Sequence, residues 1–140
     1  MSSLSFDDCK RLGFSIVGDF YSVGCNLDFN LEEFSKENGC YLFLVDEEIC
    51  YVGETQNGIR HRMRQYRKPG PSQKTNQYVK RMMLEILSGK ETVSIAFIPD
   101  KRIAALSMSL ISIGDVQVHA DSKLLERFLI SRLKPRWNRS

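Results

Sequence analysis

The stretch Gly39–Gly53 constrains the fold more than any other part of the chain, because it joins two short apolar segments through acidic residues. This pattern predicts a β-hairpin with its turn at Asp46–Glu48. The expected cross-strand pairs are Val45 with Ile49, Phe43 with Tyr51, and Tyr41 with Gly53. Odd-numbered side chains then share one face, so the two tyrosines become diagonal neighbours. A glycine opposite Tyr41 is expected to leave open space where a ligand can approach.

The remaining pattern indicates helices around this hairpin. A helix after Gly58 would bury Ile59, Met63 and Tyr66, and a second helix follows Thr75. Residues 92–98 read as a further strand, and a last helix begins near Asp121 and ends before Pro135. The sequence therefore predicts an α+β protein with a small three-stranded mixed or antiparallel sheet flanked by helices.

Segment 1–38 is expected to be an N-terminal extension packed on a core formed by residues 39–140. In it we expect a short helix near 5–11, a strand over 13–21 and a short helix from Asn30. A chain of 140 residues suits one compact domain.

The four cysteines are scattered without the spacing of a zinc site, which favours reduced and mostly buried thiols. Neither an export signal nor an apolar run long enough for a bilayer is visible. We therefore expect a cytoplasmic protein without a membrane segment.

Positive charge is concentrated in one block of the sequence. The net charge is only +3, yet residues 55–84 contain eight basic residues and no acidic residue. Such a block indicates a polyanionic partner, although a solvated helix face is the simpler alternative. The residues expected to contact such a polyanion are Arg60, Arg64, Arg67, Lys68, Lys74, Lys80 and Arg81. The loop 68–74 and the region 101–118 are candidate contact segments.

Two charged residues fall at apolar helix surfaces. Arg62 lies at the border of the packed face formed by Ile59 and Tyr66, and a snorkelling surface arginine is the alternative interpretation. Glu126 lies inside the apolar arc of the last helix, where an unpaired carboxylate is costly. It needs a metal ion or an arginine as partner, and a structural pair with Arg62 is the alternative to a metal site.

The candidate residues are of the types that bind and cleave a phosphodiester: two phenols, an arginine, a carboxylate and a basic strip. Mg²⁺ can be held by one carboxylate with waters and substrate phosphate, and it polarises the phosphate. Arginine binds phosphate with a permanent charge. A phenol has an ordinary pKa of about 10, and nearby cations are expected to favour the phenolate.

These residues resemble the GIY-YIG nuclease superfamily. The matching features are Gly39-Cys40-Tyr41, then Tyr51-Val52-Gly53, Arg62, Glu126 and the ending Lys134-Pro135-Arg136-Trp137-Asn138. In size and layout, the chain is similar to the small stand-alone restriction-type endonucleases of that superfamily. The resemblance implies Mg²⁺-dependent hydrolysis of double-stranded DNA by in-line attack of a tyrosine-activated water, with Mn²⁺ as a substitute ion.

The resemblance also implies residue roles. Tyr41 is the preferred general base, and Tyr51 would orient the water or the scissile phosphate. Arg62 would bind that phosphate, Glu126 would hold the metal, and Asn138 would support the site. All catalytic side chains are expected to converge on the hairpin face that carries the tyrosines. A Glu126 on the opposite side of the sheet from the two phenols would make this mechanism wrong.

Gly53 and Tyr66 are expected to support the site, Tyr66 standing where many members have histidine. Two positions depart from the pattern. Cys40 replaces the isoleucine of the motif, and Glu54 follows the second motif where lysine is frequent. An acid at Glu54 either removes a phosphate contact or adds to metal binding.

Other functions remain open on the sequence. The chain could be a weakly active or inactive DNA-binding module derived from a nuclease, and within the enzyme class a phage-type, repair or homing nuclease. RNA is a weaker candidate substrate, since few aromatic residues are placed for base stacking. Without a separate recognition domain, DNA specificity would come from loops or from a homodimer on DNA.

Overall fold

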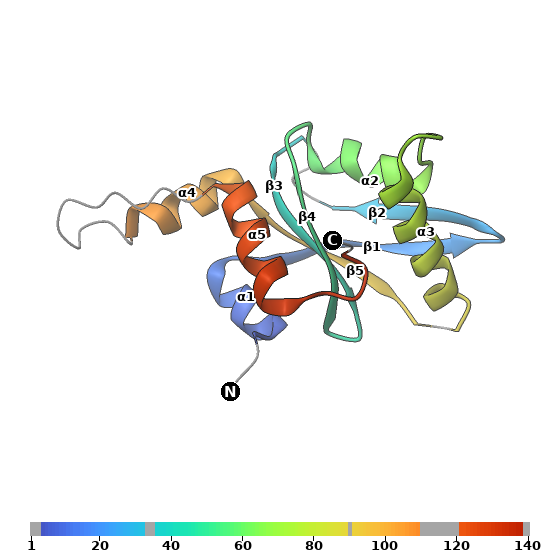
Figure 1. The fold of residues 1–140 in the computed structure, drawn as a ribbon, viewed down its shortest axis with the longest axis horizontal. Coiled ribbons are helices and arrows are strands. Elements are labelled where there is room, and N and C mark those ends of the chain that lie inside the picture. Colours follow the sequence, from blue (N-terminus) through green and yellow to red (C-terminus); the bar gives the residue numbers. More distant parts are fainter. Residues whose placement is uncertain (1–3, 33–35, 90, 110–120, 139–140) are drawn as a thin grey trace.

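The computed structural model describes residues 4–32, 36–89, 91–109 and 121–138. Figure 1 shows the order of the helices and strands along the chain. The elements are α1 (Phe6–Leu12), β1 (Ser15–Val23), β2 (Asn26–Leu31), β3 (Gly39–Val45), β4 (Glu48–Thr55), α2 (Ile59–Arg67), α3 (Lys74–Leu87), β5 (Val93–Pro99), α4 (Asp100–Ser109) and α5 (Ser122–Leu133).

The strands form a five-stranded sheet in the order β2-β1-β5-β3-β4, and every neighbouring pair is antiparallel. The prediction of three strands is therefore wrong, because β1 pairs with β5 and brings β2 into the same sheet. An irregularity between Ile16 and Gly18 interrupts the alternation of buried side chains in β1. This interruption weakens the sequence signal of that strand.

Segment 1–38 thus contributes two strands to the common sheet as well as α1. The helix expected near 5–11 is present, with Ser5 as N-cap. The helix expected from Asn30 is not formed at its start, because Asn30 and Leu31 end strand β2. Residues 33–35 lie outside the described part of the chain.

The β3–β4 hairpin has the predicted pairs Tyr41 with Gly53 and Phe43 with Tyr51, but a different turn. Asp46 and Glu47 both have positive φ, 48° and 69°, as in a two-residue primed turn. Consequently Glu48 pairs with Val45, and a bulge at residue 50 restores the register. The predicted pair of Val45 with Ile49 is wrong for this reason.

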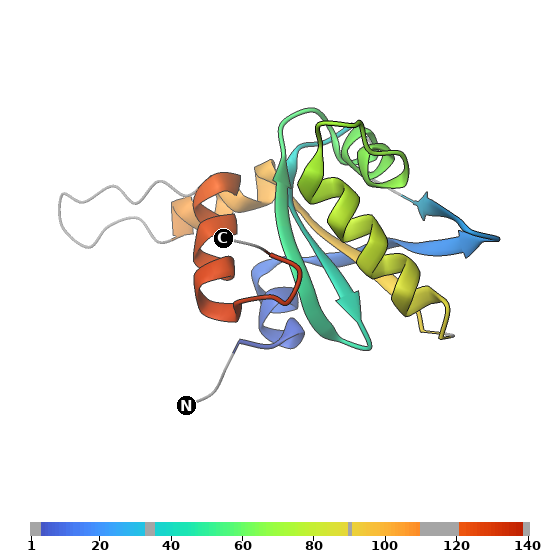
Figure 2. The same ribbon diagram turned by 45° about the vertical axis from the view of Figure 1, so that its right-hand side comes forward.

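The sheet separates two apolar clusters. On one face Tyr41, Phe43 and Tyr51 pack with α2 and α3. On the other face Cys40, Leu42 and their neighbours pack with α1 and α5. Figure 2 shows α3 crossing one side of the sheet, with α5 beside the hairpin on the other side.

The helices around the site follow the predicted pattern closely. Ile59, Met63 and Tyr66 are the buried residues of α2. Helix α5 starts after Asp121, whose side chain accepts a hydrogen bond of 2.8 Å from the Leu124 amide. It ends at Lys134, which has left-handed backbone geometry, just before Pro135.

Three of the cysteines are buried free thiols, and Cys25 is exposed. Among the described residues, no helix combines the length and the apolar character needed to cross a membrane. The region 101–118 contains most of α4, whereas residues 110–120 lie outside the described residues.

Candidate active site

The core of the candidate site is a hydrogen-bonded group of two phenols and one guanidinium. Arg62 donates from Nε to the Tyr41 hydroxyl and from Nη2 to the Tyr66 hydroxyl, at 3.0 Å in both cases. The two hydroxyl oxygens are 2.6 Å apart. Gln65 accepts a third bond from Arg62 Nη1 at 2.8 Å. Arg62 is therefore fixed over the tyrosine face of the hairpin, and the interpretation as a free surface arginine is wrong.

One hydroxyl proton in this group has no acceptor in the described part of the chain. Arg62 donates to both phenols, and one phenol donates to the other. Either assignment leaves one of the two hydroxyl protons without a partner among the described residues. Both phenols are fully buried, so the partly exposed guanidinium, with two of its five N–H groups unused, is the member of this group that an incoming phosphate can reach.

Burial opposes ionisation of these phenols. Tyr41 and Tyr66 are fully buried. Burial raises the pKa of Tyr41 above its ordinary value, and the charge of Arg62 only partly lowers it. Burial likewise raises the pKa of Tyr66. The expectation that nearby cations would favour a phenolate at Tyr41 is therefore wrong for the free protein, because desolvation is the larger effect.

Tyr51 completes the aromatic group but differs in its hydroxyl. Its ring centroid lies 6.3 Å from that of Tyr41 and 6.0 Å from that of Tyr66. Its hydroxyl has no hydrogen-bond partner among the described residues, and none of their buried polar side-chain atoms lacks a partner. The Tyr51 hydroxyl is therefore not completely enclosed, although the residue as a whole is only 7% exposed.

Gly53 lies against the Tyr41 ring. A Cβ at this position would overlap the phenol carbon and oxygen of Tyr41. The space opposite Tyr41 is thus filled by the tyrosine itself, and the expectation of an open space for a ligand is wrong.

The C-terminal segment covers the free edge of β4. Asn138 accepts from the Val52 amide through Oδ1 and donates to the Val52 carbonyl through Nδ2, both at 2.9 Å. The Trp137 amide donates to the Cys50 carbonyl, also at 2.9 Å. Asn138 therefore bonds to Val52 as a neighbouring strand would, and this pairing stabilises β4 beside Gly53.

Glu126 lies at this edge but not on the tyrosine face. Helix α5 belongs to the cluster on the opposite face, and Glu126 helps raise the pKa of Cys40 there. The expectation that all four catalytic side chains share one face of the sheet is therefore wrong. Arg62 still helps lower the pKa of Glu126, so the two groups interact across the edge of β4.

The carboxylate of Glu126 is partly buried without a cation bonded to it. Burial and the charge of Glu54 raise its pKa, whereas Arg127, Arg62 and the backbone amide of Glu54 lower it. It forms no ion pair within 4 Å among the described residues. A structural pair with Arg62 is thus not formed, because the guanidinium is directed toward the phenols and Gln65.

A second polar group joins β4 to α5. Glu54 Oε2 accepts from Gln56 Nε2 at 2.7 Å and from Ser122 Oγ at 3.1 Å. Gln56 Nε2 also lies 2.9 Å from Ser122 Oγ. Gln56, Gln65 and Ser122 belong to no motif that is visible in the sequence. Only the spacing of Gln65 from Arg62, three residues along a helix, was a visible signal.

The expected DNA contacts fall into two groups. Arg60 donates to the Leu31 carbonyl at 3.0 Å, and Arg67 pairs with Asp28 at 3.3 Å, so both hold α2 against β2. Arg64, Lys68 and Lys74 are exposed and form no ion pair among the described residues. Arg81 stacks over Tyr78, and Lys80 is half-buried on α3.

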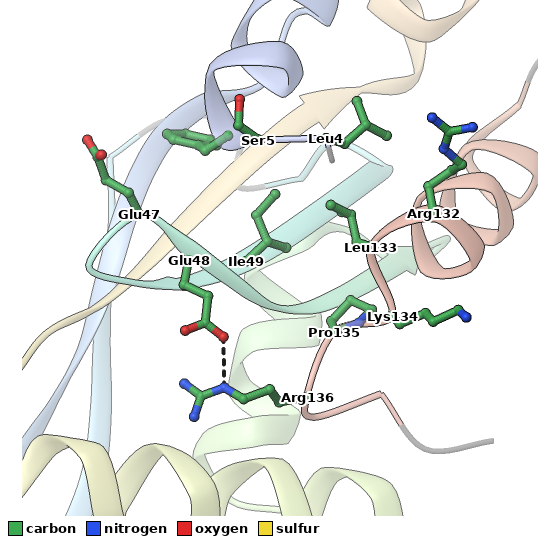
Figure 3. A pocket seen from close by; sticks show the side chains of 11 residues that line it. Leu4, Ser5, Glu47, Glu48, Ile49, Arg132, Leu133, Lys134, Pro135 and Arg136 are labelled. Atoms are coloured by element: carbon green, nitrogen blue, oxygen red, sulfur yellow. Dashed lines mark ion pairs between the residues drawn. The ribbon is translucent and has the colours of Figure 1, made fainter. Parts of the chain in front are cut away.

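A separate pocket lies at the turn of the hairpin, at the opposite end of β4 from Glu54. Its lining includes Glu48, Ile49, Arg132 and Arg136. Figure 3 shows Arg136 paired with Glu48, at 2.8 Å. This ion pair fixes the C-terminal segment and takes no part in the candidate site.

The fold belongs to a class found in DNA endonucleases. No protein-family model and no curated protein matches the sequence. Two solved structures share the fold. A mutant of bacteriophage T4 EndoII, a GIY-YIG nuclease, superposes with a TM-score of 0.67 at 16% identity, covering 96% of this chain and 98% of that one.

The restriction endonuclease Hpy188I, solved in complex with product DNA, gives a TM-score of 0.54 at 18% identity. That match covers 71% of this chain and 64% of the other. The resemblance to the small GIY-YIG endonucleases is thereby confirmed at the level of the fold.

Proposed function

We propose that this protein is an Mg²⁺-dependent GIY-YIG endonuclease that hydrolyses phosphodiester bonds of double-stranded DNA. The observation that carries the proposal is the fixed group of Arg62, Tyr41 and Tyr66 beside the partly buried carboxylate of Glu126 across the edge of β4. The scissile phosphate would lie over this edge, where Arg62 can bind it from one face of the sheet and Glu126 lies on the other.

The residues present fit a single Mg²⁺ ion. Glu126 is half-buried and forms no ion pair among the described residues, so its carboxylate oxygens can bind a cation. Mg²⁺ suits such a site, because it keeps several waters and often uses one carboxylate with substrate phosphate. When bound, the ion polarises the phosphate and stabilises the leaving oxygen.

The protein's own side chains would bind the phosphate and activate the attacking water. Arg62 holds a phosphate oxygen through a guanidinium whose orientation the two phenols fix. Tyr51 is the phenol that would meet the attacking water, because its hydroxyl has no hydrogen-bond partner among the described residues, whereas those of Tyr41 and Tyr66 are paired. Tyr41 keeps its proton in the free protein and orients Arg62. This assignment exchanges the roles that the sequence resemblance implied for the two tyrosines.

The test is incubation of plasmid and genomic DNA with the protein in Mg²⁺, in Mn²⁺ and in EDTA, with mapping of the cut ends. Glu126→Gln should abolish cleavage. Tyr51→Phe should lower the rate by about 10²–10⁴-fold, the usual contribution of a proton-transfer group. Glu85→Gln on the exposed side of α3 is the matched control and should cleave normally.

Discrete fragments would support a restriction-type enzyme, and a smear a host-DNA-degrading one. Salt-sensitive DNA binding without cutting in either metal would overturn the nuclease assignment and favour a binding module of the same fold.

A further inference from the structure

Glu54 is a carboxylate that the proposed reaction does not use, although it is adjacent to Gly53 in β4. Its Oε2 accepts from both Gln56 and Ser122, and Gln56 also contacts the Ser122 hydroxyl. Gln56 has two amide protons for its two contacts, whereas Ser122 has one hydroxyl proton, for which the Asp100 carboxylate is a second acceptor. We call Glu54, Gln56 and Ser122 the β4–α5 link.

The link contacts α5 one helical turn before Glu126. Ser122 is the first residue of α5 and is buried, with 2% of its surface exposed. Glu126 follows four residues later, so both side chains lie on the same side of the helix. Fixing Ser122 therefore fixes the helical turn from which Glu126 projects.

The other end of the link is held equally firmly. After Glu54, the buried Thr55 hydroxyl donates to the Gly58 carbonyl at 3.2 Å, and Gly58 donates to Asn38 Oδ1 at 2.7 Å. The loop that carries Gln56 is thus anchored to the sheet and to the start of α2. A single connection runs from the Arg62 helix through the loop to the Glu126 helix.

We propose that Glu54 is a positioning residue, which through Gln56 and Ser122 places the Glu126 carboxylate at the edge of β4 for Mg²⁺. This inference rests on the proposed function, since it requires Glu126 to hold the metal. Partners that orient a metal ligand usually change metal affinity by about 10–100-fold when removed. Glu54 then orients the Glu126 carboxylate and does not contact phosphate.

The test measures MgCl₂ binding by calorimetry and the Mg²⁺-induced rise in melting temperature, without DNA. Ser122→Ala should weaken Mg²⁺ binding by about 10-fold and shrink the Mg²⁺-induced rise, although every carboxylate remains. Gln56→Ala should act in the same direction, and this exposed residue can be replaced without disturbing the core. The matched controls Ser131→Ala and Asn57→Ala, both exposed, should bind Mg²⁺ like the wild type.

A double-mutant cycle separates positioning from direct ligation by Glu54. If both residues act through one link, Glu54→Ala combined with Ser122→Ala should bind Mg²⁺ no more weakly than Glu54→Ala alone. Additive losses, or a Glu54→Ala loss as complete as that of Glu126→Gln, would overturn the positioning role. Normal Mg²⁺ binding by Ser122→Ala and Gln56→Ala would overturn it as well. If the free wild type binds no Mg²⁺, the same variants are compared with a phosphorothioate duplex bound, because substrate phosphate supplies further ligands. No Mg²⁺ binding by the wild type on that duplex would overturn the metal site of the proposed function and this inference with it.

Discussion

At the scale of single residues, the site combines groups that oppose one another electrostatically. Glu126 is partly desolvated beside the like charge of Glu54, and both effects raise its pKa. In the free protein, the charged carboxylate is therefore a source of instability, which a bound cation would relieve. Such a conflict is characteristic of a site organised for a ligand.

This conflict predicts how stability depends on pH. Because the pKa of Glu126 is raised in the folded state, the folded protein binds more protons than the unfolded chain just above the ordinary carboxyl pKa. Its contribution to stability therefore falls as pH rises through the folded pKa. In EDTA, Glu126→Gln should be more stable than the wild type at pH 8, and this advantage should disappear at acidic pH.

Urea denaturation at several pH values measures this difference. Glu85→Gln changes the charge equally on the exposed side of α3 and is the matched control. A Glu126→Gln variant less stable than the wild type at pH 8 would contradict a strained carboxylate.

At the scale of elements, the hairpin determines the geometry of the site through Gly53. The missing side chain lets the Tyr41 ring lie against β4, where its hydroxyl meets Arg62. The sequence allowed the tyrosine register to be predicted, because alternation defines it. It did not reveal the turn, since a bulge at residue 50 compensates for a loop one residue shorter than expected.

Gly53→Ala should therefore damage both stability and activity. A Cβ here overlaps the Tyr41 ring, and overpacking of this kind costs about 1–3 kcal/mol. Displacing that ring should also break the bond between Tyr41 and Arg62 and lower the cleavage rate. Gly70→Ala is the control, because a Cβ there meets nothing closer than a flexible glutamine side chain at 3.7 Å. Equal stability of the two variants in urea would contradict close packing at Gly53.

At the scale of the whole molecule, sequence patterns predicted contacts near in sequence better than those between distant segments. The buried face of α2 and the N-cap of α5 follow from periodicity and local chemistry. The pairing of β1 with β5 and the position of α5 behind the tyrosine face depend on how the sheet is assembled. Periodicity shows that a helix buries one side, but not which face of a sheet it covers.

The structure also separates the basic block into residues that hold the fold and residues that remain exposed. Arg60 and Arg67 bind β2, whereas Lys68 and Lys74 flank an exposed loop between α2 and α3. If this loop contacts DNA phosphates, each lysine should contribute about 0.9 to the slope of log K against log salt concentration. Combining Lys68→Ala with Lys74→Ala should thus reduce the slope by up to about 2, with stability changed by less than about 0.5 kcal/mol.

The matched control replaces two exposed lysines on the helices of the opposite face, Lys10→Ala with Lys123→Ala, which removes the same charge. Binding to a short duplex, measured by fluorescence anisotropy between low and moderate salt, distinguishes a local contact from a general field effect. A local contact changes the slope only for the loop lysines, because counterions are released only where a side chain replaces them on the phosphates. Equal changes in the two double variants would show that the loop is not the DNA-binding surface.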